Sequence, residues 1–502
     1  MDNADADVRQ LAYQLRISWD KQFDPDVTFF TLDTSQLNGP DVLAPSDNNI
    51  VQEWDKYDYA DFTSRVIQME WTREEDVPYS VSLAMADLTL NNYDSYFTRG
   101  SSILDPNILP RRPVRLLSGF RSVSIPQFVG LTETVPIVDK SRRIASVHCM
   151  DFLAFLFNKP LDQTVMLEDV RTDEVLDYLF QLFGLTPSQY VLDEGYNVIK
   201  FVYWEKGKKL GDAVRELMQA ELGSLFMDEL GVIKFNNRLR PSTAAVMTFD
   251  DSNIIDYQIS NETKIINVVE VKSSVREVQP TQVVFTSAGA IELQTGSNEI
   301  FFSFEDPITS LETIDDYLAN SQEDGGGTDE TADVTVTDTD LFDKSVKVTF
   351  NNTSGAVAYI TELNLYGTPA KVVRDIYLRV QDDNSVAQFE EQPISIENNL
   401  IQDNDGANSI ALSLLNYYKD YSNTIEIDVK GNPALQLRDN ILIKIDDINE
   451  TYNITKITNI LDNSGRYIQR LTARIFNTAE FFILSSDDTA MSLLNGRDVL
   501  AP

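Results

Sequence analysis

The chain contains one histidine and one cysteine, and these two residue types, well suited to nucleophilic and metal chemistry, are neighbours. His148 and Cys149 lie in segment 143–150, where apolar and polar residues alternate as in a strand. Because adjacent strand residues point to opposite faces, we expect no thiolate–imidazole pair. One cysteine excludes an internal disulfide, and one histidine leaves too few ligands for a Cys/His zinc site. We therefore interpret both residues as structural.

The other chemical motifs are incomplete. Residues 403–406, Asp-Asn-Asp-Gly, begin like a calcium loop, but Leu412 stands where that loop needs a glutamate. We interpret Asp405 as a helix cap. Neither a phosphate-binding loop nor a GxSxG elbow occurs, and the basic cluster 206–209 reads as a solvated turn. Among 79 acidic residues, no two are singled out as a general acid and base. The sequence thus predicts a non-enzymatic protein with no metal and no cofactor.

Composition sets further bounds. With 502 residues, 42% of them apolar, the chain can bury several cores. Its net charge of −38 would repel DNA, because nucleic-acid binders need basic surface to displace counterions. The acidity serves either solubility alone or a surface that a polyanion passes without sticking.

Targeting signals are not evident. The longest apolar run, 152–157, is far shorter than the ~20 residues that span a bilayer. Residues 1–7 are acidic, whereas a secretory signal begins with basic residues. If the protein reaches the outside of a cell, we expect it to leave by another route, such as lysis.

One supersecondary unit, residues 201–240, organises the rest of the chain. The run 201–204 predicts a strand, and apolar residues from Leu210 to Leu222 recur at helical spacing. Gly223 is expected to end this helix, and residues 225–235 predict a hairpin with a turn at Gly231. A second helix is predicted from Thr172 to Phe183. Thr172 would cap it and Gly184 would close it.

Strands dominate elsewhere. Short β-branched and aromatic runs separated by turn residues fill 54–160, and strands return after residue 240. Residues 325–330 form a flexible acidic linker within a β-rich insertion. A helix is predicted to begin near Asp405, with further strands after it. The predicted class is therefore α+β, mainly β.

A nine-residue motif occurs near both ends of the chain. Residues 37–45 and 494–502 are identical except that Arg497 replaces Pro40. Either the motif is a duplicated linker, or both copies occupy equivalent grooves on neighbouring subunits or partners. On the second interpretation the candidate contact residues are Leu37, Asn38, Gly39, Val42, Leu43, Leu494, Asn495, Gly496, Val499 and Leu500.

The order of these modules resembles the tail-hub proteins of tailed bacteriophages. That family includes the baseplate hub of T-even phages and the N-terminal part of siphophage tail-tip proteins. Three stretches carry the resemblance, and together they span most of residues 50–480. They are Arg112–Leu116 with Gln127–Leu131 and Cys149–Leu153; the helix and hairpin Leu210–Phe235; and Ile266–Val271 with Gly431–Ile441.

The resemblance implies a homotrimer in which each subunit supplies two tube-like β-barrels. Three subunits would form a pseudo-hexameric ring that continues the hexameric tail tube in the virion. The implied domains are an extended segment 1–50, a first barrel 51–160, an α/β domain 161–255, a second barrel split between 256–285 and 372–480, a β-rich insertion 286–371 and an extended segment 481–502.

The resemblance also implies partners. These are the protein itself, a distal tail or tail tube protein, a tape measure protein and a tail fibre or tip protein. Genomic DNA would pass through the ring at ejection without specific binding, and a negative lumen would help it slide. No peptidoglycan-cleaving domain follows residue 480, which departs from tail-associated lysins.

Two alternatives remain open. Residues 360–367 are similar to carbohydrate-binding β-sandwiches, so the insertion could belong to a receptor-binding tail protein that contacts host-surface glycans. The chain could also be a cell-wall hydrolase that uses two unplaced carboxylates.

Overall fold

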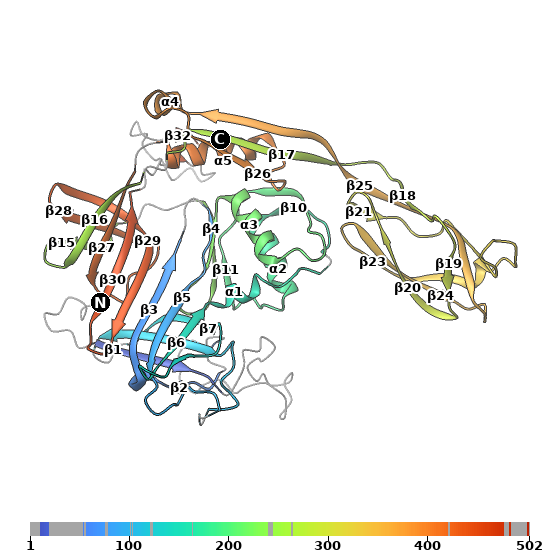
Figure 1. Ribbon diagram of the computed structural model, residues 1–502. Coiled ribbons are helices and arrows are strands. Elements are labelled where there is room, and N and C mark those ends of the chain that lie inside the picture. Colours follow the sequence, from blue (N-terminus) through green and yellow to red (C-terminus); the bar gives the residue numbers. More distant parts are fainter. Residues whose placement is uncertain are drawn as a thin grey trace, which may run out of the picture.

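A computed structural model describes residues 11–19, 54, 57–75, 79–100, 102, 104–120, 124–162, 164–238, 244–262, 265–419, 422–475, 481–482 and 499–500. Strands make up most of the secondary structure, which confirms the mainly β class (Figure 1). None of the described helices combines the length and the hydrophobicity that crossing a membrane requires.

One large sheet joins the N-terminal and C-terminal β segments. Its main path runs β16 (Ile254–Glu262), β27 (Ser422–Lys430), β30 (Tyr467–Arg474), β29 (Ile448–Asp462), β3 (Val66–Glu74), β5 (Met85–Asn91), β9 (Ile144–Met150), β7 (Ile125–Thr132), β6 (Pro113–Phe120), β1 (Leu11–Ile17) and β2 (Ala60–Asp61). Branches add β28 (Asn440–Ile445), β15 (Met247–Asp250) and β8 (Ile137–Asp139).

The join lies between β3 and β29, which pair in antiparallel register from Gln68–Asp462 to Glu74–Lys456. The predicted closure into two barrels is not found, because no sheet of the described chain returns to its own first strand. In the N-terminal half, β29 occupies the edge of β3. The C-terminal half ends at β15 and β16, which do not pair with each other in the described chain. Each half still has its own apolar core, one around Trp71 and one around Tyr452.

An α/β layer packs beside this sheet and contains the supersecondary unit predicted for residues 201–240. Its elements are β4 (Ser80–Val81), α1 (Phe152–Leu156), β10 (Leu167–Arg171), α2 (Thr172–Leu182), β11 (Tyr190–Leu192), β12 (Val198–Val202), α3 (Leu210–Glu221), β13 (Ser224–Met227) and β14 (Ile233–Asn236). The predicted helix from Leu210 and the hairpin after it are confirmed as α3 and β13–β14.

Two of three predicted helix ends differ in detail. Leu222, not Gly223, takes the left-handed conformation (φ 56°) that ends α3. Gly223 is instead required by packing, since a Cβ there would lie 2.7 Å from the Phe235 ring. Thr172 is the first residue of α2 rather than its cap, because Arg171 is the last residue in extended conformation. Gly184 closes α2 with a φ of +78°, as predicted.

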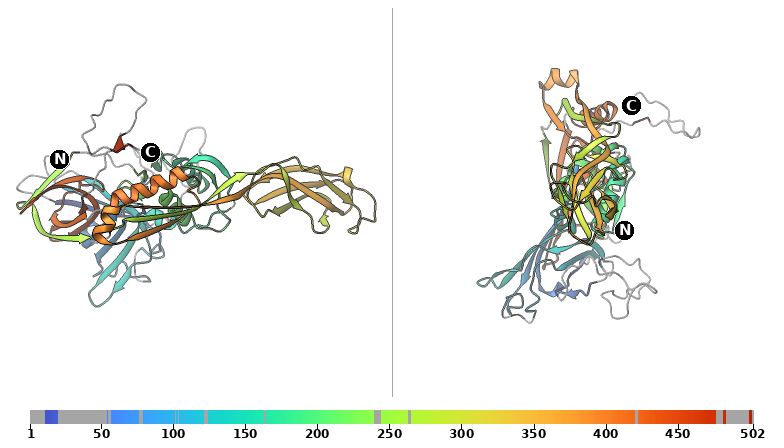
Figure 2. Two further views of the ribbon diagram at one scale, coloured as in Figure 1. Left: turned by 90° about the horizontal axis from the view of Figure 1, so that it is seen from above. Right: turned by 90° about the vertical axis from the view of Figure 1, so that its right-hand side faces the viewer.

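A long ribbon carries a second, separate β module (Figures 1 and 2). Its strands β17 (Val268–Val278) and β25 (Ala358–Gln381) pair in antiparallel orientation, and β26 (Pro393–Glu397) flanks β17. The module consists of β18 (Gln282–Thr286), β19 (Ile291–Leu293), β20 (Gly296–Ser303), β21 (Ile308–Leu311), β22 (Tyr317–Asn320), β23 (Val334–Leu341), β24 (Ser345–Asn352) and the first part of β25. It has its own apolar core, which includes Phe350 and Ile360.

Helices α4 (Asp383–Phe389) and α5 (Asn404–Tyr418) follow the ribbon. Short 3-10 turns, Thr63–Arg65 and Thr331–Asp333, and the pair β31 (Phe481–Phe482) and β32 (Val499–Leu500) complete the description. Helix α5 packs its apolar stripe on β17 and β25, so the base of the ribbon shares the core of the α/β layer. The predicted domain boundaries remain predictions.

Candidate functional site

The terminal motif lies almost wholly outside the described residues. Of its ten candidate contact residues, only Val499 and Leu500 are described, and they form β32, which pairs in parallel with β31. Leu37, Asn38, Gly39, Val42, Leu43, Leu494, Asn495 and Gly496 lie outside the described part of the chain. A contact role for the motif therefore stays a prediction.

The two residues considered first for chemistry, His148 and Cys149, lie on opposite faces of β9. His148 is exposed and contacts Asp87, whereas Cys149 is buried on the other face of β9. Burial raises the pKa of the Cys149 thiol well above its ordinary value, so the thiol stays protonated at neutral pH. Among the residues that the structure describes, no three His, Cys, Asp or Glu side chains are placed to share a metal ion.

Asp403, two residues before the expected position, caps α5. Its carboxylate accepts a 2.6 Å hydrogen bond from the Gly406 amide. Asp405 already lies in the first helical turn and cannot reach back to cap it. The predicted cap residue was therefore wrong, although the start of the helix was close to the predicted position.

The basic turn after β12 forms ion pairs instead of standing free in solvent. Lys208 lies 2.5 Å from Glu216 and Lys206 lies 2.8 Å from Asp162. The turn borders a cavity of about 720 Å³ between the α/β layer and the base of the ribbon. Tyr203 and Arg276 also line this cavity.

A buried ion pair joins three parts of the fold. Arg438 Nε donates to both oxygens of Glu75 at 2.9 Å, and Arg438 Nη2 donates to Ser224 Oγ at 2.7 Å. Glu75 follows β3, Ser224 begins β13, and Arg438 precedes β28. Glu75 is completely buried, so this pair connects both halves of the large sheet to the α/β layer. Nearby, Arg73 Nη1 contacts Glu229 and Gln436, each at 3.0 Å.

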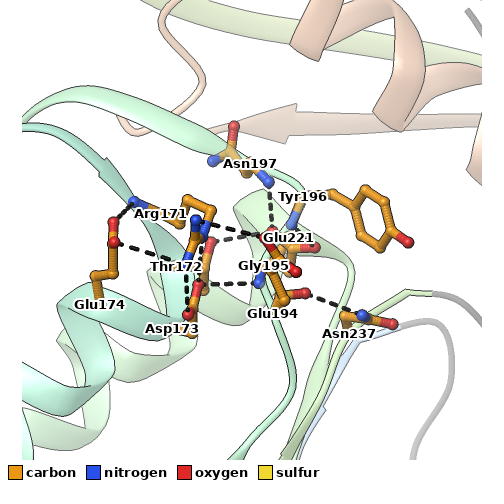
Figure 3. Close-up of polar contacts among 10 residues, drawn as sticks. All are labelled: Arg171, Thr172, Asp173, Glu174, Glu194, Gly195, Tyr196, Asn197, Glu221 and Asn237. Carbon is orange, nitrogen blue, oxygen red and sulfur yellow. Dashed lines mark hydrogen bonds and ion pairs between the residues drawn. The ribbon is translucent and has the colours of Figure 1, made fainter. Parts of the chain in front are cut away.

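A second buried carboxylate fixes a loop within the α/β layer (Figure 3). Glu221, fully buried at the end of α3, accepts hydrogen bonds from Thr172 Oγ1 at 3.0 Å and from the amides of Tyr196 and Asn197 at 3.0 and 2.8 Å. Arg238 Nε lies 3.8 Å away. These contacts hold the loop between β11 and β12 against α2 and α3.

Both carboxylates occupy positions that the local sequence pattern marks as buried. Glu221 follows Leu217 by four residues and Met218 by three, so it falls on the apolar stripe of its helix. Glu75 continues the buried alternation of Met69, Trp71 and Arg73. A charged residue at a core position needs a buried partner, although its identity cannot be read from the pattern.

The face of the large sheet opposite its cores is polar and predominantly acidic. Alternate residues of seven strands, from β16 to β9, share this face, as their cross-strand registers show. The acidic side chains on it are Glu70, Glu74, Asp87, Asp256, Glu426, Asp428 and Asp462, against Lys430, Lys456, Arg470 and the largely buried Arg474. Glu70 stands directly opposite Asp87, and Asp256 opposite Asp428. Like charges directly opposite each other oppose stability, but Asp87 also contacts His148, and Asp428 pairs with Arg470 at 2.9 Å.

The same sheet ends in an edge strand with exposed apolar side chains. On β16, Tyr257 and Ile259 pair with Ile427 and Ile425, which are buried. Tyr257 and Ile259 point to the same face but are 38% and 43% exposed. No described strand pairs with the outer edge of β16. This combination of unpaired backbone and uncovered apolar surface is typical of an edge that another chain extends.

A pH-sensitive carboxyl lies at the start of α1. Burial raises the pKa of Asp151 to about 7, although its carboxylate accepts from the Ala84 and Ala154 amides. A raised folded-state pKa means that the stability this residue contributes is complete below its unfolded pKa and is lost as pH rises through about 7. We expect wild type to lose up to about 2 kcal/mol relative to Asp151→Asn between pH 5 and pH 7. Urea titrations across this range measure the difference, and parallel pH profiles for the two proteins would contradict it.

No family model and no curated protein matches the chain. Several solved structures are similar to it at very low identity. A tail protein from Neisseria meningitidis is 9% identical, with a TM-score of 0.48, over 93% of this chain and 96% of that one. A prophage tail protein from Shewanella oneidensis is 10% identical, with a TM-score of 0.46, over 83% and 95%. A prophage tail protein from Listeria monocytogenes is 8% identical, with a TM-score of 0.40, over 84% and 93%.

Proposed function

We propose that the chain is a non-enzymatic structural hub at the tip of a phage tail, where three copies form a ring that continues a hexameric tail tube. The observation that carries this proposal is the pairing of β3 with β29. Through it, one chain presents two β segments side by side in a continuous sheet. Three copies of such a subunit supply six β segments, so a ring with threefold symmetry could join a tube with sixfold symmetry.

The polar face of that sheet would line the ring. Its seven acidic and four basic side chains leave it with negative charge, and Arg470 and Lys456 are engaged with neighbouring carboxylates. Such a wall offers phosphates few cationic contacts, so DNA would pass through at ejection without binding. The partners proposed with this role are a distal tail or tail tube protein, a tape measure protein and a tail fibre or tip protein. Receptor binding to glycans through the insertion stays a prediction.

The β16 edge would be the contact between neighbouring copies. Pairing there would satisfy its unpaired backbone groups and cover Tyr257 and Ile259. We therefore expect light scattering to give a mass of about three times 56.7 kDa for wild type and a monomer mass for the double variant Tyr257→Glu/Ile259→Glu.

A matched control separates this effect from added charge. Val191→Glu introduces the same side chain at a position that is 52% exposed on β11, away from the β16 edge, and should leave the trimer intact. A wild-type protein that stays monomeric at every concentration, or a trimer that the double variant retains, would overturn the proposal.

A further inference from the structure

The ribbon that carries the β module has a neck that belongs to neither core. The base of the ribbon packs in the core of the α/β layer through Val275 and Ile376, and the module's own core includes Leu365 and Ile308, which pairs with Pro369. Between them, the four consecutive residues 372–375 are all exposed. The pairing register also shifts between Val275 and Arg276. The neck meets the α/β layer at Arg276, whose guanidinium lies 5.6 Å from the centre of the Tyr203 ring. A two-stranded ribbon with few covering contacts is only marginally stable by itself.

A turn of the module contacts the α/β layer, which with the large sheet forms the body of the protein. The turn at residues 342–345 joins β23 to β24, and its Asp343 amide donates a 3.1 Å hydrogen bond to the carbonyl oxygen of Thr164. Lys344 Nζ lies 3.4 Å from Glu205 Oε1. Thr164 is held firmly in turn, because its hydroxyl donates to the Trp204 carbonyl and accepts from the Trp204 amide, each at 3.0 Å.

The contact between the 342–345 turn and residues 164 and 205 is polar, and it combines a weak ion pair with an unfavourable buried carboxylate. Lys344 and Glu205 are 32% and 73% exposed, so their ion pair is weak. Asp343 is 5% exposed and its Oδ2 atom has no hydrogen-bond partner, which opposes closure. The cavity of about 720 Å³ lies beside this contact. Glu205, from the turn after β12, and Arg276, from the neck, both line it. Separation here would therefore expose little apolar surface.

We propose that the β module, residues 282–370, is a hinged arm that swings about its neck at 276–281 and 371–375, and that the 342–345 turn is a latch holding it against Thr164 and Glu205. The arm moves as a unit because its core is self-contained. Its motion needs no unfolding of the body, whose core ends at the base of the ribbon. This inference does not depend on the proposed trimer.

Energy transfer between two dyes tests the latch in the full-length chain. One dye is placed at Ser354→Cys, in the turn between β24 and β25 at the opposite end of β24 from the latch, and the other at Ser188→Cys on the body; the native Cys149 is buried. Lys344→Glu places a carboxylate beside Glu205 and Asp343 and should increase the open population by about threefold or more. The reversed pair Lys344→Glu/Glu205→Lys should restore the wild-type distribution.

The matched control is Lys347→Glu, which makes the same charge change three residues further along β24. Lys347 pairs with Asp340 inside the module, so this variant should leave the distance distribution unchanged. An unchanged distribution in Lys344→Glu would overturn the latch. So would a double variant that is as open as Lys344→Glu. Circular dichroism that matches wild type for each variant ensures that the readout is motion of a folded arm.

Discussion

Alanine in place of Arg438 is expected to lower the free energy of unfolding by about 3–5 kcal/mol. The loss comes from Glu75, whose side chain has no exposed surface and accepts from Arg438 through both oxygens. Without Arg438, that carboxylate would remain buried and would lose the guanidinium, while the Ser224 hydroxyl, 2.5 Å away, would still donate to it. Leaving a buried charge without its counter-ion costs far more than the net value of the intact pair.

We expect the loss of stability to extend beyond the Glu75–Arg438 pair, because this pair connects both halves of the large sheet to the α/β layer. Urea denaturation measures the loss, and hydrogen exchange should show faster exchange at the end of β3 and the start of β13. Arg470→Ala is the matched control. Arg470 binds Asp428 at 2.9 Å on the exposed face and should cost less than about 1 kcal/mol. Equal losses in the two variants would contradict a special role for the buried pair.

Local patterns predicted the elements of this fold well. Helix α3 and its hairpin follow from apolar spacing and turn residues between Leu210 and Phe235, all of which act over a few positions. Opposite faces for His148 and Cys149 follow equally from strand geometry. The predicted cap of α5 was wrong because two nearby aspartates, Asp403 and Asp405, both suit a helix N-cap.

Long-range pairing could not be predicted in the same way. Glu75 and Arg438 are 363 positions apart, and neither local sequence identifies the other. The β3–β29 pairing that merges the two halves is set by which edges meet, a choice that many strands of similar composition could satisfy. The sequence does mark Glu75 and Glu221 as charged residues at core positions. Such a mark predicts that a buried partner exists without naming it.

Glu221→Ala is expected to cost about 3–5 kcal/mol, because one substitution leaves several buried donors without their acceptor. The hydroxyl of Thr172 and the amides of Tyr196 and Asn197 all donate to this carboxylate (Figure 3). The nearby Arg238 side chain is 14% exposed and would lose its counter-ion as well. Glu221→Gln keeps one acceptor oxygen, so its loss should be smaller than that of the alanine variant.

The same substitution should release the loop between β11 and β12 without unfolding the large sheet. Hydrogen exchange at the amides of Tyr196 and Asn197 is the direct measurement, since these two lose their acceptor. Glu194→Ala is the control within the same loop: its side chain is 77% exposed and pairs only at the surface with Arg171, 3.4 Å away. Its expected cost is below about 0.5 kcal/mol. If Glu221→Ala left those amides as protected as in wild type, the loop would have to be held by its neighbours alone, and the buried carboxylate would not be the group that fixes it.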